Sequence, residues 1–224
     1  DYINEKYNEE CAVNLMGHTM FEHGKYDAKV FFSKVDDAIK HGYKYIYAYY
    51  PDPDATLHGC GNYSKETSNT IKSINDNLEQ LVKNNPDVLF ISVADHGHID
   101  IKLCSLDEHS DLYDTLATPY FCEARAGMIN IKKGREKEFE KLFDKYYKEH
   151  FELYSKKEIV EKQIFGYSTN YCHDYDKILG DYLMVSKDEY TLFFENYDSS
   201  GMLSTHAGGT EREGLINISV YNNL

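Results

Sequence analysis

The amino-acid sequence predicts an α/β fold, and three consecutive segments carry this prediction. Residues 43–50 (YKYIYAYY) are aromatic and β-prone and end at a proline, which favours a strand. Residues 87–94 (DVLFISVA) are almost continuously apolar, as is typical of a parallel strand covered on both faces. Between them, residues 64–84 carry apolar side chains at spacings of three and four, the stripe of an amphipathic helix. These apolar residues are Ile71, Ile74, Leu78, Leu81 and Val82. Strand, helix and strand in this order predict a right-handed βαβ unit.

The remaining elements are predicted in chain order. Residues 31–42 (FFSKVDDAIKHG) predict a short helix that ends at Gly42. Ser155 and Glu158 have the spacing of a capping box, which predicts the start of a helix that continues to Phe165. Further predictions are a strand over 127–133, a helix over 135–149, a hairpin from 181–187 and 190–196, and a final strand over 215–221.

Length and composition bound the organisation of the chain. The 224 residues suit a single domain over 1–224, with residues 118–195 as a candidate accessory subregion. No internal repeat or flexible linker divides it. No apolar run approaches the roughly 20 residues that cross a bilayer, so we expect no membrane contact. The chain begins at Asp1, which indicates a processed chain or a piece of a longer one.

The charge excludes one class of partner. Asp and Glu number 38 against 24 Lys and Arg, a formal net charge of −14. Such a surface repels phosphate backbones, so we expect no nucleic-acid polymer as a partner. An acidic protein that handles phosphates needs metal ions to do so.

The cysteines indicate the compartment. Five of them are scattered along the chain without a CxxC pair, at Cys11, Cys60, Cys104, Cys122 and Cys172. An odd, unpaired set favours free thiols in a reducing, cytoplasmic compartment over a disulfide framework.

Acid and histidine side chains follow both predicted strands. Asp54 and His58 come after residues 43–50, and Asp95 and His96 come after residues 87–94. Ligands of α/β proteins bind beyond the carboxyl ends of strands, so loops there can bring the two sets together. Carboxylate and imidazole are ligands for zinc or a similar divalent ion. Taken singly, each set also fits an ordinary turn, in which the aspartate caps the turn or Gly97 supplies a positive φ.

Three motifs extend this pattern to a family. The segments PDATLHGCG, SVADHGH and STHAGGTEREGLINISV resemble those of the alkaline phosphatase superfamily, in the branch of the type I phosphodiesterases and nucleotide pyrophosphatases. The order, spacing and strand context of the motifs agree with that branch, and the segment EARAG (123–127) resembles a linking segment of its bacterial members. The resemblance implies an alkaline-phosphatase-like, mostly parallel sheet flanked by helices.

The resemblance also implies a set of ligands. Asp54, His58 and His206 would hold one divalent ion, and Asp95 and His96 would hold a second. His98 would contact the substrate phosphate or support His96. Zinc is the expected metal, with manganese as the alternative. Three protein ligands leave a position for water or phosphate, but two ligands make the second set incomplete.

The missing ligands bear on catalysis. In the family they are an aspartate and a Thr or Ser nucleophile near the N-terminus, and no such arrangement of strand, aspartate and nucleophile precedes Phe31. We therefore assign no catalytic nucleophile to this chain. We expect the chain to be the C-terminal part of a longer enzyme, with the sheet incomplete at its N-terminal side.

The implied function is hydrolysis of small phosphate esters or nucleotides by two-metal catalysis. Two alternatives stay open at this point. One is another branch of the superfamily, such as a phosphomutase or a sulfatase, which would share the ligands. The other is a non-catalytic, metal-stabilised domain that forms a homodimer through an exposed sheet edge.

Other polar residues receive a plainer interpretation. The remaining histidines are expected at the surface or in packing contacts, namely His18, His23, His41, His109, His150 and His173. Glu211 and Glu213 follow His206 closely, and either lie near the site or belong to a solvated loop.

Overall fold

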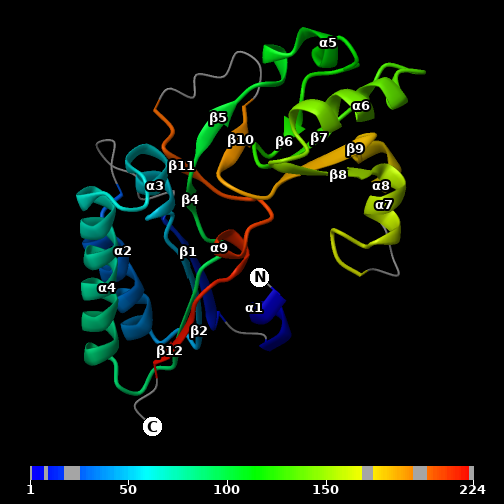
Figure 1. The fold of residues 1–224 in the computed structure, drawn as a ribbon. Helices are drawn as coiled ribbons and strands as arrows, with labels where there is room; N and C mark the ends of the chain where they lie inside the picture. The colour runs from blue at the N-terminus through cyan, green and yellow to red at the C-terminus, as the bar shows by residue number, and fades with distance from the viewer. Residues whose placement is uncertain (1, 8–9, 18–25, 168–173, 194–200, 222–224) are drawn as a thin grey trace. The chain divides into compact units, whose positions relative to one another are not determined.

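The computed structural model of the chain describes residues 2–7, 10–17, 26–167, 174–193 and 201–221. Two compact units divide it: residues 1–93 with 217–224 form unit 1, and residues 94–216 form unit 2 (Figure 1). Among the described residues, no helix has both the length and the apolar character needed to cross a membrane.

Unit 1 contains a parallel βαβ arrangement near its start. Strand β1 (Ala12–Met16) pairs in parallel with β2 (Tyr45–Tyr49), and helix α2 (Ala28–His41) connects them. The carboxylate of Asp27 caps the start of α2, and Gly42 ends it with a left-handed φ of 96°. The predicted helix and strand are confirmed, but no strand was predicted before Phe31. The short segment AVNLM contains Asn14 in its middle, which interrupts the apolar run that would have indicated a strand.

Two further helices complete the helical side of unit 1. Short helix α3 (Asp54–Cys60) precedes long helix α4 (Lys65–Asn84), which confirms the predicted amphipathic helix. Helix α4 lies beside α2, as Figure 1 shows. The core between them contains Phe31, Val35 and Leu81, of which Phe31 is only 2% exposed. A short N-terminal helix, α1 (Tyr2–Tyr7), also belongs to this unit.

The second predicted strand has an unexpected partner. Strand β3 (Phe90–Val93) pairs antiparallel with β12 (Ile218–Tyr221), the predicted final strand of the chain. The prediction of a parallel strand covered on both faces is wrong, because Ile91 and Val93 are 62% and 61% exposed. An apolar run shows that a strand forms, but it does not identify the strand's neighbour.

Unit 2 is built around a four-stranded antiparallel sheet in the order β6-β7-β9-β8. Its strands are β6 (Phe121–Cys122), β7 (Ala126–Ile129), β8 (Phe151–Ser155) and β9 (Tyr182–Ser186). Helix α6 (Glu136–Tyr146) packs Phe139 and Phe143 into the core of this unit. The alternation of strand and helix predicted for residues 127–149 is therefore confirmed.

Smaller elements surround this sheet. The helices are η2 (Leu106–Glu108), α5 (Ser110–Tyr113), α7 (Lys156–Glu161), α8 (Tyr175–Ile178) and α9 (Glu211–Gly214). The strands are β4 (Ile99–Asp100), β5 (Lys102–Cys104), β10 (Tyr190–Leu192) and β11 (Ser204–Thr205). The capping box of Ser155 and Glu158 is present and begins α7, which ends before the predicted Phe165.

The predicted hairpin of residues 181–187 and 190–196 is wrong. Strand β9 pairs with β7 and β8, whereas β10 pairs in parallel with β5. Residues 194–196 lie outside the described residues. The partner β5 comes from a distant part of the sequence, so no local pattern could have identified it.

The fold class is mixed α/β. Within the described residues the strands form five small sheets, of which β1-β2 and β10-β5 are parallel and the others antiparallel. The expected single, mostly parallel sheet is not seen among them. The sequence shows each strand, but long-range pairing decides how strands join into a sheet.

The described cysteines are free thiols: Cys11, Cys60, Cys104 and Cys122. Burial raises the pKa of the Cys104 thiol to about 12, with smaller contributions from nearby carboxylates. Cys172 lies outside the described residues.

Candidate metal centre

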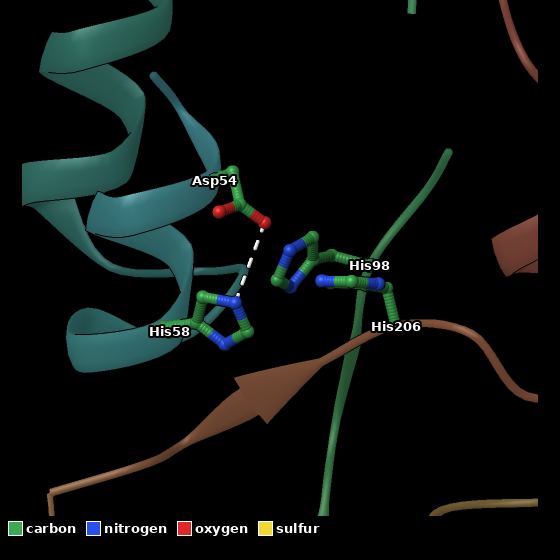
Figure 2. A group of neighbouring side chains, drawn as sticks. All are labelled: Asp54, His58, His98 and His206. Carbon is green, nitrogen blue, oxygen red and sulfur yellow. Dashed lines mark ion pairs between the residues drawn. The ribbon is translucent and has the colours of Figure 1, made fainter. Parts of the chain in front are cut away.

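The first acid and histidine set lies on a helix of unit 1. Asp54 is the first residue of α3 and His58 lies one turn later, so both side chains point from the same face. The carboxylate of Asp54 lies 3.4 Å from Nε2 of His58, as the dashed line in Figure 2 marks. The expectation that this set lies on a loop is wrong. The helix gives the pair a fixed spacing that a loop would not.

Neighbouring residues hold α3 in place. The carboxylate of Asp52 accepts hydrogen bonds from the backbone N and the hydroxyl of Thr56, at 3.2 and 3.0 Å. At the other end, Gly61 ends the helix, and its carbonyl accepts a 2.7 Å hydrogen bond from the buried hydroxyl of Thr67 in α4. Helix α3 is therefore tied to the longer helix, which positions the Asp54 and His58 pair.

Three imidazoles gather in unit 2. The rings of His96 and His206 stack with their centroids 3.8 Å apart and 19° between their planes. His98 lies close to both, at 5.1 Å from His206 and 5.6 Å from His96. Figure 2 draws His98 and His206 side by side, from segments more than 100 residues apart in the sequence. The distant C-terminal motif and the DHGH motif thus meet within one unit.

Hydrogen bonds orient two of these rings. Nδ1 of His98 lies 2.9 Å from the hydroxyl of Ser204, and Nδ1 of His96 lies 3.1 Å from the carbonyl of Gly97. A hydrogen bond at Nδ1 fixes the ring and favours metal binding through Nε2, which is the usual arrangement of histidine ligands. Both rings therefore have the support typical of metal-binding histidines.

Asp95 lies beside the imidazoles at the surface. Its side chain is 62% exposed, and Oδ1 lies 3.6 Å from Nε2 of His96. The same oxygen accepts a 3.1 Å hydrogen bond from the backbone N of His96. The aspartate and the histidine thus present a carboxylate and an imidazole at the same surface position.

The glycines of both motifs are required by close packing. A Cβ atom at Gly97 would lie 1.9 Å from the carbonyl oxygen of Arg212. A Cβ atom at Gly208 would lie 2.7 Å from Nε of Arg125. No side chain fits in either space, so the DHG and HAGG segments can pack against their neighbours only with glycine.

The residue after His206 is conformationally strained. Ala207 has a φ of 71°, in the left-handed region that costs an L-residue about 1–2 kcal/mol. Strain of this kind persists only where surrounding contacts impose it. The backbone that carries His206 is therefore held by its neighbours and does not rest in a relaxed conformation.

An ion pair that was not predicted lies behind these loops. Nε of Arg125 is 2.6 Å from a carboxylate oxygen of Glu213, and their side chains are 0% and 1% exposed. The interpretation of Glu213 as part of a solvated loop is wrong, because its side chain is buried. The sequence signal was an arginine between two alanines directly before an apolar strand, an unusual place for a charge.

Several of the other histidines have packing or hydrogen-bonding contacts. His109 stacks on Tyr146 at 3.7 Å, and His41 lies 5.0 Å from the ring of Tyr43. His150 stacks on Tyr190, and its Nδ1 lies 2.6 Å from the carboxylate of Asp188. His18, His23 and His173 lie outside the described residues.

Each of the two units carries side chains of the kinds that bind a divalent metal. Asp54 and His58 in unit 1, and His98 and His206 in unit 2, each offer one atom able to bind a cation. Carboxylate and imidazole are the ligand types that zinc and related ions prefer. Assignment of particular residues to a first and a second ion stays a prediction.

Comparison with known proteins gives a family match. The family described as type I phosphodiesterase / nucleotide pyrophosphatase matches residues 1–210. No curated protein sequence matches the chain.

Solved structures share the fold. Murine ectonucleotide pyrophosphatase / phosphodiesterase 5 is similar with a TM-score of 0.69 and 16% identity, over 99% of this chain and 62% of that chain. An inactive variant of the murine protein in complex with AMP gives the same score and identity over 63% of its chain. The human protein of the same name gives a TM-score of 0.68 and 17% identity over 62% of its chain. The present chain thus spans less than two thirds of each relative.

Proposed function

Because this chain belongs to the type I phosphodiesterase/nucleotide pyrophosphatase family, we propose that it carries the metal-binding part of an enzyme that hydrolyses phosphate esters. The observation that supports this proposal most directly is the stacking of His96 on His206 beside His98. Three polar imidazole rings contribute little to a hydrophobic core, but imidazoles are common ligands of a metal cation.

The ligand assignment follows the family motifs. We propose that Asp54, His58 and His206 hold one divalent ion, and that Asp95 and His96 contribute to a second. Zinc fits these donors best because it prefers imidazole and carboxylate at low coordination number, and manganese is the alternative. The fit is chemical: a carboxylate oxygen of Asp54 lies 3.4 Å from Nε2 of His58, so two donors of the first set already lie close together.

Two divalent ions, when bound, supply the positive charge that an in-line displacement at phosphorus needs. The residues of the chain have their own roles. The carboxylates of Asp54 and Asp95 offset part of this charge, and the neutral imidazoles leave the rest to act on the substrate. His98, whose Nδ1 meets Ser204, is proposed to contact a substrate phosphate oxygen. The nucleophile is not assigned to any residue of this chain.

The substrate class is proposed to be a small phosphodiester or a nucleotide. The same ligands would serve a phosphomutase or a sulfatase, so the assay needs three chromogenic esters. These are bis(4-nitrophenyl) phosphate, 4-nitrophenyl phosphate and 4-nitrophenyl sulfate. We expect the protein that contains this chain to cleave the diester fastest. Preference for the sulfate ester would favour a sulfatase.

The direct test is metal binding by the chain. Isothermal titration calorimetry with zinc should show tight binding to the chain. His58→Ala should lower the zinc affinity more than about 100-fold. The reason is that even the hydrogen-bond partners of metal ligands are each worth about 10- to 100-fold in affinity. His41→Ala is the matched control, because His41 is exposed at the end of α2 and contacts Tyr43. Diester hydrolysis that survives both a chelator and His58→Ala would contradict the proposal.

A second candidate function is self-association, and one observation favours it. Ile91 and Val93 of β3 lie directly opposite Val220 and Ile218 of β12. All four side chains point to one face of the sheet, and each is more than 60% exposed. Because the chain carries a formal net charge of −14, two copies repel each other least when they meet through an uncharged surface such as this.

A further inference from the structure

Arg125 uses every hydrogen-bond donor of its guanidinium group inside unit 2. Nε and one terminal nitrogen donate to the two carboxylate oxygens of Glu213, at 2.6 and 2.9 Å. The terminal nitrogens also donate to the carbonyls of Tyr190 and Asp188, and to the hydroxyl of Thr191. The arginine is 0% exposed, so these five bonds replace its entire hydration. A fully bonded arginine of this kind fixes the position of the carboxylate that it holds.

The Glu213 carboxylate in turn holds the loop that carries His206. One carboxylate oxygen accepts a 2.7 Å hydrogen bond from the backbone N of Gly208, two residues after His206. The other accepts a 2.6 Å bond from the hydroxyl of Thr210. These two bonds hold the backbone in which Ala207 has its left-handed φ of 71°. The direction of the His206 ring therefore depends on the Glu213 carboxylate.

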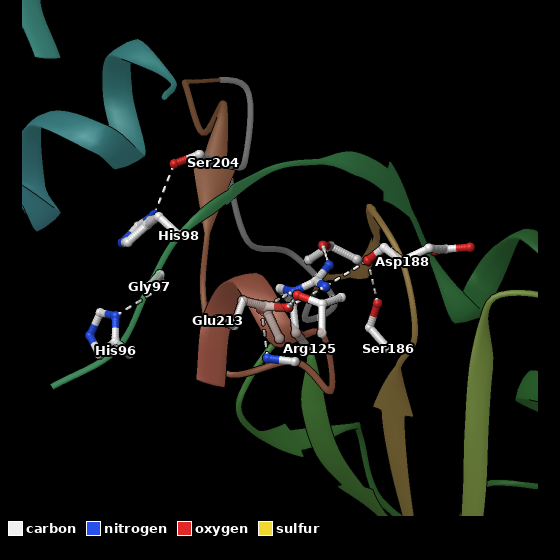
Figure 3. A network of polar contacts seen from close by, with 12 residues as sticks. His96, Gly97, His98, Arg125, Ser186, Asp188, Ser204 and Glu213 are labelled. Carbon is white, nitrogen blue, oxygen red and sulfur yellow. Dashed lines mark hydrogen bonds and ion pairs between the residues drawn. The ribbon is translucent and has the colours of Figure 1, made fainter. Parts of the chain in front are cut away.

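The same residue also holds the segment with His96 and His98. The backbone carbonyl of Glu213 accepts a 2.9 Å hydrogen bond from the backbone N of Gly97, which lies between the two histidines. Figure 3 shows Arg125 and Glu213 at the centre of this network, with His96, Gly97 and His98 on the neighbouring segment that leads into β4. Glu213 thus joins the two segments that supply the stacked imidazoles.

We propose that the buried pair of Arg125 and Glu213 is a positioning device for the metal site, which sets the His206 imidazole against His96. This inference rests on the proposed function for its effect on metal affinity. Glu213 contacts neither substrate nor metal in this scheme. It acts through the Gly208 and Thr210 bonds, so it is a positioning residue.

The rival explanation is that the pair only stabilises unit 2. Removing one member of a buried ion pair destabilises any protein, so stability alone cannot distinguish the explanations. Replacing both members by apolar residues of similar size is often tolerated. The double variant Arg125→Met with Glu213→Leu is therefore informative, because it removes the carboxylate that accepts the hydrogen bonds of Gly208 and Thr210 and puts apolar side chains in place of the ion pair.

The chain offers a matched control. Arg135 and Glu138 form an ion pair in the same unit at 2.7 Å, with side chains 34% and 50% exposed. Arg135→Met with Glu138→Leu makes the same chemical change at the surface. A milder variant, Thr210→Val, removes a single donor to Glu213 and preserves the buried pair, so it keeps the test informative if the double variant does not fold.

Two measurements on the zinc-free chain test the positioning itself. In the double variant we expect the amide of Gly208 to exchange its proton faster, and the nuclear Overhauser contacts between the His96 and His206 rings to disappear. The amide of Gly97 is an internal reference, because it donates to the backbone carbonyl of Glu213, which every variant retains. Thr210→Val should give a smaller change in the same direction, and the surface control none.

Zinc affinity then tests the consequence. We expect it to fall about 10- to 100-fold in the double variant and to stay unchanged in the surface control. A folded double variant, or Thr210→Val alone, that keeps both the ring contacts and the affinity would overturn the inference. If the unchanged chain binds no zinc, the proposed function fails, and the ring contacts still decide whether Glu213 positions His206.

Discussion

At the scale of single residues, Glu213 is a side chain whose role the sequence left open and which the structure buries beside Arg125. Burial acts to raise the pKa of its carboxyl group, but hydrogen bonds from Arg125, Thr210 and Gly208 outweigh burial and lower it below the ordinary 4.5. The carboxylate is therefore stabilised in the folded state relative to the unfolded chain. Such a group links the stability of the fold to pH.

The sign of this linkage gives a prediction. A lowered pKa contributes stability that is fully present above pH 4.5 and is lost as the pH falls below it. Glu213→Gln should lower the free energy of unfolding at neutral pH by about 3–5 kcal/mol, because it leaves Arg125 buried without its partner. The free energy of unfolding of this variant should also fall less steeply between pH 5 and pH 3 than that of the unchanged chain. Urea unfolding at a series of about five pH values measures this dependence.

The control for this experiment is Glu149→Gln, since Glu149 is exposed and lies in a turn outside the helices and strands. Its unfolding free energy should follow that of the unchanged chain at every pH. Parallel curves for Glu213→Gln and the unchanged chain would show that the Glu213 carboxylate does not contribute to acid unfolding.

The residues in and around the candidate site differ in how far the sequence indicated them. The candidate ligands lie in short motifs with a characteristic spacing, so a local pattern was enough to predict them. They are Asp54, His58, Asp95, His96 and His206. Arg125 and Glu213 are 88 residues apart, and only folding brings them together. Isolated charged residues in a sequence are mostly exposed, and this is why the motif gave Glu213 two interpretations.

At the scale of secondary-structure elements, the junction of α3 and α4 supports the Asp54 and His58 pair. The hydroxyl of Ser64 accepts a 3.0 Å hydrogen bond from the backbone N of Thr67, which caps the start of α4. Thr67 is 1% exposed, and its own hydroxyl bonds the carbonyl of Gly61 at the end of α3. The cap therefore stabilises α4 and fixes the helix that carries the two candidate ligands.

Removing this cap has a defined cost. Ser64→Ala should lower the free energy of unfolding by about 1 kcal/mol, the usual value for loss of a serine cap. Thermal unfolding followed by circular dichroism measures this change. Ser73→Ala is the control in the same helix, because Ser73 is an exposed interior position where alanine is the better helix former. Equal stability of Ser64→Ala and Ser73→Ala would contradict a role for the cap.

Elements with strong local signals were predicted well. Helix α2 has a terminal glycine, α4 has a serine cap and an apolar stripe, and α7 has a capping box, and all three form. Elements without such signals were missed or misassigned. Helix α3 is seven residues long and was predicted as a loop, because its Pro53 and its glycines are typical of turns.

At the scale of the whole molecule, the β3-β12 sheet exposes an apolar face on a chain with a formal net charge of −14. Ile218 and Val220 are 65% and 61% exposed, close to the values of their partners on β3. An uncovered apolar face on a two-stranded sheet favours association. We propose a second copy of the chain as the occupant of this face.

Light scattering tests this proposal. The mass should rise from that of a monomer toward twice that value with concentration, and Val220→Lys should keep it at the monomer mass. Tyr63→Lys is the control, because Tyr63 is 84% exposed and lies between α3 and α4 of the same unit, outside the β3-β12 sheet. A monomer at every concentration would contradict self-association, and loss of the dimer in both variants would place the contact elsewhere.

The sequence by itself determined the family, the longer helices α2, α4 and α6, and the residue types of a candidate divalent metal site. These follow from local patterns: periodic apolar residues, capping residues, and carboxylates with imidazoles at fixed spacing. The sequence could not reveal which strands pair, for example β10 with β5 or β3 with β12. Strand pairing depends on contacts between distant segments, and a single strand's pattern is compatible with several partners.

Only the tertiary structure decided what holds the candidate ligands. It brought His206 onto His96 and buried Glu213 against Arg125 behind both of their loops. The physical reason is desolvation. A buried charge is tolerated only where donors and acceptors from distant segments converge on it, and such convergence has no signature in the local sequence.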